Sequence, residues 1–465
     1  MAVNNGDTDT IDVENLASSI QVTMSQYGLF MPPKRCIFKT PIALYRHNNK
    51  AYIPDAFSIG PLHHGRPNCP NFEATETIKA KYLQGFISRF QNPILKDLIN
   101  SVSALEREAR EYYAGPIDYS REEFVKILVI DGCFMIELLC RNASMKLREE
   151  KDPIFGMSAM IEFLAHDLIL LENQLPWMVL DHLFKKLENQ LPLMDPDHLF
   201  NMSPDGRKTA KTLIDLAIEF FDSIFILPPP DRPDLVRDIQ HIPDLFKKLL
   251  VSSIKVDQDH MPYATLLDMG ENEYSSIEGD EEENSRLESG QHVPTAKRLM
   301  EAGIKFRMSE SKNMFDIRFT NGVLEIPQIK IHEITETFLR NLISFEQCYP
   351  NSDKRITSYA ILLDNLITTA KDVEILSENK IIDNWLNPED AAKFFNELYN
   401  DTCVETYYYE KLCREVNKYC EKTWNKCRAV LVGKYFNTPW AGLSSLAAVI
   451  LLILNFVQSW DSITS

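Results

Sequence analysis

Four side chains capable of acid–base chemistry stand out in this sequence: His63, His64, Asp131 and Glu137. Histidine exchanges protons near neutral pH, and a carboxylate in an apolar segment needs a partner and often marks a functional site. One hypothesis is therefore a hydrolase or transferase whose pocket is assembled from these four residues.

The spacing of these residues favours structural roles instead. Neighbouring histidines in an extended segment point to opposite sides, so His63 and His64 rarely bind one ion together. Asp131 and Glu137 are separated by about 600° around a helix and therefore face different directions. We expect the histidines to stabilise a turn and the carboxylates to pair with basic side chains of neighbouring helices. The sequence predicts no catalytic residue, no cofactor and no metal site.

Three polar residues, Glu172, Asn173 and Gln174, directly precede Leu175 and Pro176 in an otherwise apolar run. Proline cannot donate a hydrogen bond to the preceding turn, so backbone carbonyls there need other donors. We expect these side chains to satisfy those carbonyls, and the alternative is an edge that binds a partner.

Two further clusters suggest contacts with other molecules. Tyr407, Tyr408 and Tyr409 cannot all face one core from a helix, so they are a candidate partner surface. Cys413, Cys420 and Cys427 recur every seven residues, which indicates a buried seam of small side chains. Alternatively, Cys427 is a candidate site of lipidation by S-acylation.

The composition narrows the function classes. The chain has 465 residues, is 45% hydrophobic and carries a formal net charge of -18, which argues against binding nucleic acid. Its nine cysteines are an odd number without a disulfide framework, as expected for reduced thiols. We find no phosphate-binding glycine loop and no GxSxG, HExxH or CxxC motif, and the N-terminus does not resemble a signal peptide.

The patterning divides the chain into five parts. Residues 1–30 are polar and predicted to be disordered, and residues 31–252 form an N-terminal helical lobe whose central buried helix lies near 123–141. A tandem duplication with a 16-residue period, LENQLP twice, spans 171–200. Residues 253–290 form an acidic linker that is predicted to be disordered. Residues 291–432 form a C-terminal helical lobe, and 438–458 a terminal apolar helix.

A single β-hairpin is predicted at about 315–326 in this C-terminal lobe. Asn321-Gly322 favours a two-residue type I′ turn between FDIRFT and VLEIP. That register places Phe319 opposite Leu324 and Arg318 opposite Glu325. The hairpin therefore has an apolar face and an ion-pair face.

The C-terminal segment has the length and composition of a membrane span. The eighteen residues from Trp440 to Val457 contain no charge and would extend about 27 Å as a helix. Basic residues precede the segment, so the N-terminal body is predicted to face the cytosol. The alternative is a buried core helix. The predicted anchor residues are Trp440, Leu446, Val449, Leu452, Phe456 and Trp460.

Several segments in the same order resemble one plant family: SIGPLHHG, FVKILVIDGCFMIELL, DLILLENQLPWMVL and PTAKRLMEAGIKF. The chain is similar to the plant "domain of unknown function 247" family over about residues 35–457. The resemblance implies a mostly helical plant protein with a membrane anchor and no established catalytic residues. Some members are implicated in pollen–stigma recognition, which implies interaction rather than catalysis. The doubled LENQLP segment departs from the family pattern.

Together these features predict a mostly α-helical, multi-helix body with one small hairpin and a C-terminal transmembrane helix. The expected function is a non-catalytic, membrane-anchored interaction or recognition protein with unknown protein partners. The expected location is the plasma membrane, with the endoplasmic reticulum as the alternative.

Overall fold

The computed structural model describes residues 12–26, 34–65, 71–90, 92–188, 200–202, 208–222, 237–252, 292–311, 313–350, 352–384, 386–422, 428, 447, 450–458 and 460. The first half of the chain is almost entirely helical. Its elements are α1 (Val13–Gln26), α2 (Ile42–Tyr45), the 3-10 turn η1 (Asn49–Tyr52), α3 (Asn71–Ser88), α4 (Leu95–Glu111), α5 (Arg121–Ala143), η2 (Met145–Leu147), α6 (Ser158–Leu168), α7 (Trp177–Glu188), β1 (Phe200–Met202), β2 (Lys208–Ala210), α8 (Leu213–Asp222) and α9 (Ile242–Ser252).

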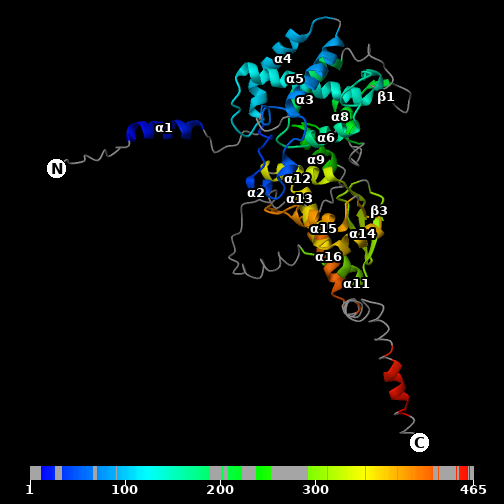
Figure 1. Cartoon of the computed structure of the whole chain (residues 1–465). Coiled ribbons are helices and arrows are strands. Elements are labelled where there is room, and N and C mark those ends of the chain that lie inside the picture. The colour runs from blue at the N-terminus through cyan, green and yellow to red at the C-terminus, as the bar shows by residue number, and fades with distance from the viewer. Residues whose placement is uncertain are drawn as a thin grey trace, which may run out of the picture.

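Helix α5 is the centre of this first half, as its apolar sequence predicts. A capping box begins it, because the Ser120 side chain accepts from the Glu123 amide and Glu123 accepts from the Ser120 amide. Helices α3, α4, α7 and α8 pack around α5 (Figure 1). Gly132 permits the close approach of α7, since a Cβ there would lie 2.5 Å from Leu183 Cδ1.

The second half combines a small sheet with short helices. Its elements are α11 (Ala296–Glu301), β3 (Lys305–Ser309), β4 (Arg318–Thr320), β5 (Val323–Pro327), β6 (Ile329–Ile331), α12 (Glu333–Cys348), α13 (Arg355–Leu366), α14 (Ala370–Glu378), β7 (Ile382–Asn384), α15 (Pro388–Glu397) and α16 (Glu410–Cys420).

The predicted hairpin is confirmed in position and register. Strands β4 and β5 pair antiparallel with Phe319 opposite Leu324, around Asn321 (φ 51°) and Gly322 (φ 80°). Arg318 lies opposite Glu325 as predicted, and each also has another partner: Arg318 binds Asp316 at 2.7 Å, and Glu325 binds Arg307 at 2.9 Å. Arg307 comes from β3, which joins β5 in parallel and makes a three-stranded sheet.

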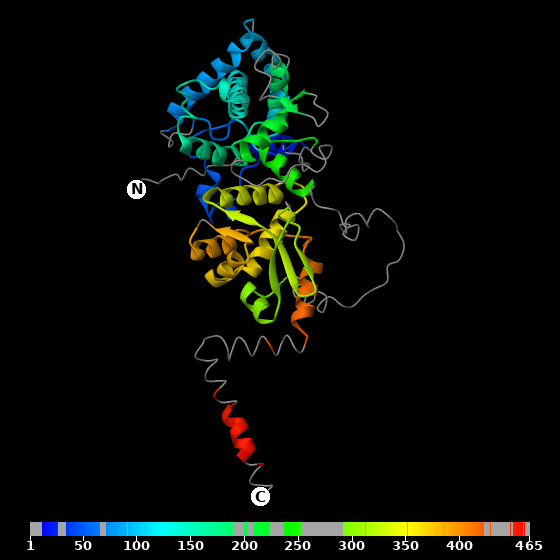
Figure 2. The ribbon, with the colours of Figure 1, turned by 90° about the vertical axis from the view of Figure 1, so that its right-hand side faces the viewer.

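Helix α12 lies between the two halves and contacts both (Figure 2). The Asn341 amide donates to the Ala51 carbonyl at 2.7 Å, and its oxygen accepts from the Leu171 amide at 2.9 Å. The rings of Phe338 and Phe246 meet edge to face, 5.5 Å apart between centroids. Contacts between residues far apart in the sequence thus join the two halves. The division into two lobes stays a prediction.

Part of the predicted disordered N-terminus is helical. Asp12 accepts a hydrogen bond from the Asn15 amide at 3.1 Å, as an N-cap does, and α1 follows. The apolar residues Val13, Leu16, Ile20 and Met24 recur at helical spacing and are all exposed. Figure 1 shows α1 lying apart from the folded body.

The prediction of a transmembrane helix at 438–458 is wrong. Within the residues described, none of the helices is both long enough and apolar enough to cross a membrane. Of the predicted span, the structure describes residues 447 and 450–458, which are helical. Leu452, Phe456 and Trp460 are exposed, whereas Trp440, Leu446 and Val449 lie outside the described residues. The membrane as a partner, the plasma-membrane location and the cytosolic orientation rested on that span and are withdrawn with it.

Other predictions fall outside the described part of the chain. The acidic segment 253–290 is one, and Cys427 is another. The first LENQLP copy lies between α6 and α7. Of the second copy, at 187–192, the structure describes only the first two residues.

Candidate functional site

A groove on the outer side of the helical half is the candidate site. It has a volume of about 530 Å³ and lies between α3, α4 and α5. We call it the α4–α5 groove and define it by its apolar lining residues, which are Leu83, Leu95, Ile99, Val125, Val129 and Ile130.

The wall of the groove on α4 is unusually exposed. Leu95 and Ile99 are 42% and 41% exposed although both are large and apolar. They lie one helical turn apart and face the buried side chains of Val125 and Val129, also one turn apart on α5. The groove therefore offers two parallel rows of aliphatic side chains to an incoming apolar surface.

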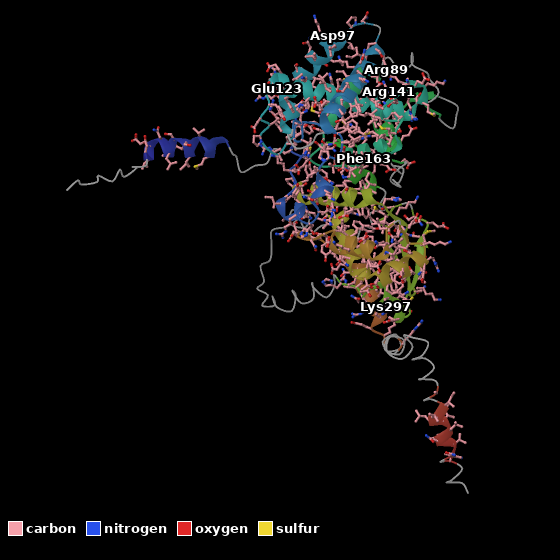
Figure 3. The ribbon with its side chains drawn as sticks, viewed as in Figure 1. Arg89, Asp97, Glu123, Arg141, Phe163 and Lys297 are labelled. Atoms are coloured by element: carbon pink, nitrogen blue, oxygen red, sulfur yellow. The ribbon has the colours of Figure 1, made fainter. Side chains whose placement is uncertain are left out.

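Charged side chains border these rows. Arg121, Glu122 and Lys126 line the groove and are exposed. The Arg121 guanidinium donates to the Ser103 carbonyl at 3.1 Å, which bridges the first turn of α5 to α4. Figure 3 places Asp97 of α4 and Glu123 of α5 at the end of the molecule opposite Lys297 of α11. The rim has two cations and one carboxylate, and it favours an acidic partner mainly through Lys126, because Arg121 Nε already lies 4.0 Å from Glu106 Oε2.

Of the predicted acid–base residues, Asp131 forms a buried ion pair. Its carboxylate accepts from Lys79 Nζ at 2.6 Å and from the Gly60 amide at 2.8 Å. Burial alone would lower the pKa of Lys79, but the charges of Asp131 and Glu76 outweigh it and raise that pKa. The pair joins α5 to α3 and to the loop before α3.

Glu137 belongs to a second buried network. It accepts from Arg89 Nε and Arg141 Nε, each at 2.7 Å, and Figure 3 shows both arginines in the helical half. Arg141 also binds Asp152 at 2.7 Å, and Asp152 accepts from the Tyr82 hydroxyl at 2.8 Å. Burial would raise the pKa of Asp152, yet these hydrogen bonds lower it. Asp131 and Glu137 thus neutralise different cations, as their helical spacing predicts.

The two histidines also contact different groups. His63 is buried with Nε2 3.8 Å from Glu172 Oε2, and Glu172 accepts from the Thr40 amide at 2.9 Å. His64 packs edge to face on Tyr119, whose hydroxyl donates to the His64 carbonyl at 2.7 Å. The structure places both in the turn at 61–65 that the sequence suggested.

Two side chains of the polar run before Pro176 satisfy backbone carbonyls, but these belong to the end of α6 and the residues just after it rather than to the turn before the proline. Gln174 donates to the Leu168 and Leu170 carbonyls at 2.7 and 2.8 Å. Asn173 donates to the Asp167 carbonyl at 2.9 Å. These side chains satisfy the end of α6 and hold the non-helical segment that precedes α7.

The tyrosine run is mostly packed inside. Tyr407 and Tyr409 are both 8% exposed, and Tyr409 donates to the Phe315 carbonyl at 3.0 Å. Tyr408 is half-buried, with the Arg355 guanidinium 4.5 Å from its ring centroid. Only Tyr408 remains available for the partner surface, which stays a prediction.

One cluster has the residue types of a metal site. Ligand atoms of Asp55, His166 and Asp167 lie within 4.8 Å of one another. However, Asp167 already accepts from the amides of Asp55, Ala56 and Phe57, at 2.6 to 2.9 Å, and lies 3.0 Å from His166 Nδ1. These donors use the lone pairs that a metal would need, so the cluster serves to hold the loop before α3.

The α4–α5 groove was not predicted from the sequence. Leu98, Val102 and Ala109 form the buried stripe of α4, and Leu95 and Ile99 widen its apolar face beyond what that stripe needs. This excess of apolar positions is the signal that could have revealed it. Whether Leu95 and Ile99 are covered depends on how closely α3 and α5 approach α4.

The fold and the groove define a mostly helical protein with an apolar, charge-bordered surface groove. Residues 37–454 match the model of the domain-of-unknown-function-247 family, described as plant proteins of unknown function, and the chain belongs to this family. The predicted resemblance is thereby confirmed. The chain is 27% identical to the UPF0481 protein At3g47200 of Arabidopsis thaliana, over 92% of this chain and 86% of that protein. The putative UPF0481 protein At3g02645 of the same plant is 23% identical over 92% of this chain and 90% of that protein. No solved structure matches the chain.

Proposed function

We propose that this protein is a non-catalytic interaction protein whose α4–α5 groove receives an acidic amphipathic helix. The observation that carries the proposal is the pair of large, half-exposed side chains Leu95 and Ile99 above the aliphatic row of Val125 and Val129. Grooves with such rows bind helices that present apolar side chains at i, i+3 or i+4, and i+7. Arg121 and Lys126 supply charge complementarity to acidic residues beside that stripe.

The alternative catalytic pocket has weaker support. Its Asp131 is bound by Lys79, and its Glu137 is bound by Arg89 and Arg141, so each carboxylate already has a cationic partner and the two do not meet in one pocket. Interaction is therefore the better hypothesis for this chain.

The test is selection of helical peptides from a displayed library on the full-length protein, followed by titration of the selected peptides. We expect enriched peptides with an apolar stripe flanked by Asp or Glu. Ile99→Glu should weaken their binding at least tenfold, because it places a charge where an apolar anchor packs. Since Ile99 is 41% exposed, we expect the same change to alter the free energy of unfolding by less than about 1 kcal/mol.

Met300→Glu is the matched control. Met300 is 45% exposed near the end of α11, outside the groove, so its replacement should leave peptide binding unchanged. Equal binding to wild type and Ile99→Glu, or no enrichment over a scrambled library, would contradict the proposal.

A further inference from the structure

We infer that the α4–α5 groove is occupied, within the same molecule, by helix α1. The inference rests on the proposed function, since it names the helix that the groove receives. It unites two exposed apolar features of this chain, one on the helical body and one on its N-terminal segment.

The first argument is the apolar stripe of α1. Val13, Leu16, Ile20 and Met24 follow the spacing i, i+3, i+7 and i+11 and lie on one side of the helix. Their exposed fractions are 71%, 49%, 50% and 71%. A helix this short gains little stability alone in water, so burial of the stripe against another surface would stabilise it.

The spacing of the α1 stripe suits the rows of the groove. The rows formed by Leu95 and Ile99 and by Val125 and Val129 each span about 6 Å, one helical turn. Neighbouring residues of the α1 stripe are also about one turn apart, so one or two turns of α1 can contact both walls.

The third argument is the position of the tether. The chain is anchored to the C-terminal end of α4 by the Lys34–Glu108 ion pair at 2.7 Å, and the Cys36 amide donates to the Tyr112 carbonyl at 3.0 Å. Residues 27–33 join this anchor to α1 and can extend about 28 Å from Gln26 to Lys34. Leu95 lies about 20 Å from Glu108 along α4. The whole groove is within reach.

The N-terminal segment is acidic, whereas the groove rim carries basic side chains. Before Lys34 the sequence contains no basic residue and four acidic ones, which are Asp7, Asp9, Asp12 and Glu14. Arg121 and Lys126 are on the groove rim. Docking places an acidic segment beside a mainly basic border and so favours α1 over a basic helix.

Photo-crosslinking tests the docked state in the full chain. Benzoylphenylalanine at Ile20 should form adducts with the groove residues of α4 or α5, identified by mass spectrometry. The matched control is the same group at Ser18, on the opposite side of α1, which should give at least fivefold fewer groove adducts. Ile99→Glu should abolish the Ile20 adduct.

Isotope mixing separates one molecule from two. In an equimolar mixture of nitrogen-15-labelled and unlabelled chains, docking within one molecule gives adducts of a single isotope composition. Mixed adducts would show that a second copy supplies α1, and absence of groove adducts would show that α1 does not dock; either result overturns the inference.

Peptide affinity distinguishes this inference from the proposed function. A short tether gives an effective concentration of about 1 mM, so a helix with an intrinsic Kd of about 0.1 mM would reduce the affinity of a competing peptide about tenfold. Leu16→Glu with Ile20→Glu should therefore increase the affinity of the selected peptides about tenfold. Unchanged affinity with intact peptide binding contradicts only the role of α1, whereas loss of all peptide binding contradicts the proposed function as well.

Discussion

Arginine–carboxylate pairs occur both within α5 and in the β3–β5–β4 sheet, but in opposite surroundings. Glu137 and Arg141 are 0% and 3% exposed, whereas the side chains of Glu325 and Arg307 are 33% and 64% exposed. A buried charge that loses its partner is strongly destabilising, and an exposed pair contributes little. The helical half therefore depends on charge pairing, and the sheet depends on its backbone register.

The largest expected effect tests the buried side of this comparison. Glu137→Ala leaves Arg89 and Arg141 without their shared carboxylate, so we expect the free energy of unfolding to fall by about 3–5 kcal/mol. Glu325→Ala, the exposed control, should cost less than about 1 kcal/mol. Denaturant titration of both variants measures the difference, and similar losses would refute the contrast.

A smaller effect is expected at His241, where α9 meets α12. Its Nε2 lies 3.0 Å from the Cys36 carbonyl and its Nδ1 accepts from the Asp244 amide at 3.2 Å, an arrangement that fits the neutral ring. Burial lowers the pKa of His241 to about 4, below its usual 6.5. As the pH falls, His241 is therefore protonated at a higher pH in the unfolded chain than in the folded protein.

Stability from this group is present above pH 6.5 and is lost as the pH falls toward 4. The loss amounts to about 3 kcal/mol. Unfolding measured at a series of pH values should show a shallower decline for His241→Gln than for the wild type over that range. Parallel curves would mean that His241 does not titrate as its burial implies.

The smallest effect tests the sheet. Gly322 has φ 80°, and a Cβ there would lie 2.5 Å from the Tyr419 hydroxyl oxygen. Gly322→Ala should destabilise the protein by about 1–2 kcal/mol through the turn conformation and that contact. A Cβ at Gly115 would meet no atom within 4 Å, so Gly115→Ala should be nearly neutral in thermal unfolding. Equal melting temperatures for the two variants would remove the turn as the determinant of register.

Features that depend on residues close together in the chain were predicted from the sequence, whereas features that depend on distant residues were not. The α5 helix, the Asn321-Gly322 turn and the hydrogen bonds of Asn173 and Gln174 to backbone carbonyls were predicted because each depends on residues close in the chain. Strand β3 was missed because its partner β5 begins eighteen positions later, at the pairing Lys305 with Val323. The transmembrane prediction rested on the composition of one apolar segment, whereas within the described residues no helix is both long enough and apolar enough to cross a membrane.

The candidate site shows the same limit. Exposure of Leu95 and Ile99 depends on how α3 and α5 pack beside α4, which no local pattern reveals. Conversely, the buried positions of Tyr407 and Tyr409 depend on neighbours distant in the chain, including Phe315.

The sequence by itself determined the helical character of the first half, the hairpin register and the family. Spacing, turn residues and charge order decide these features locally. Only the tertiary structure decided which cations Asp131 and Glu137 bind and that α12 joins both halves. It alone decided that an apolar groove stays open between α4 and α5, because burial is a property of neighbours that the chain brings together only on folding.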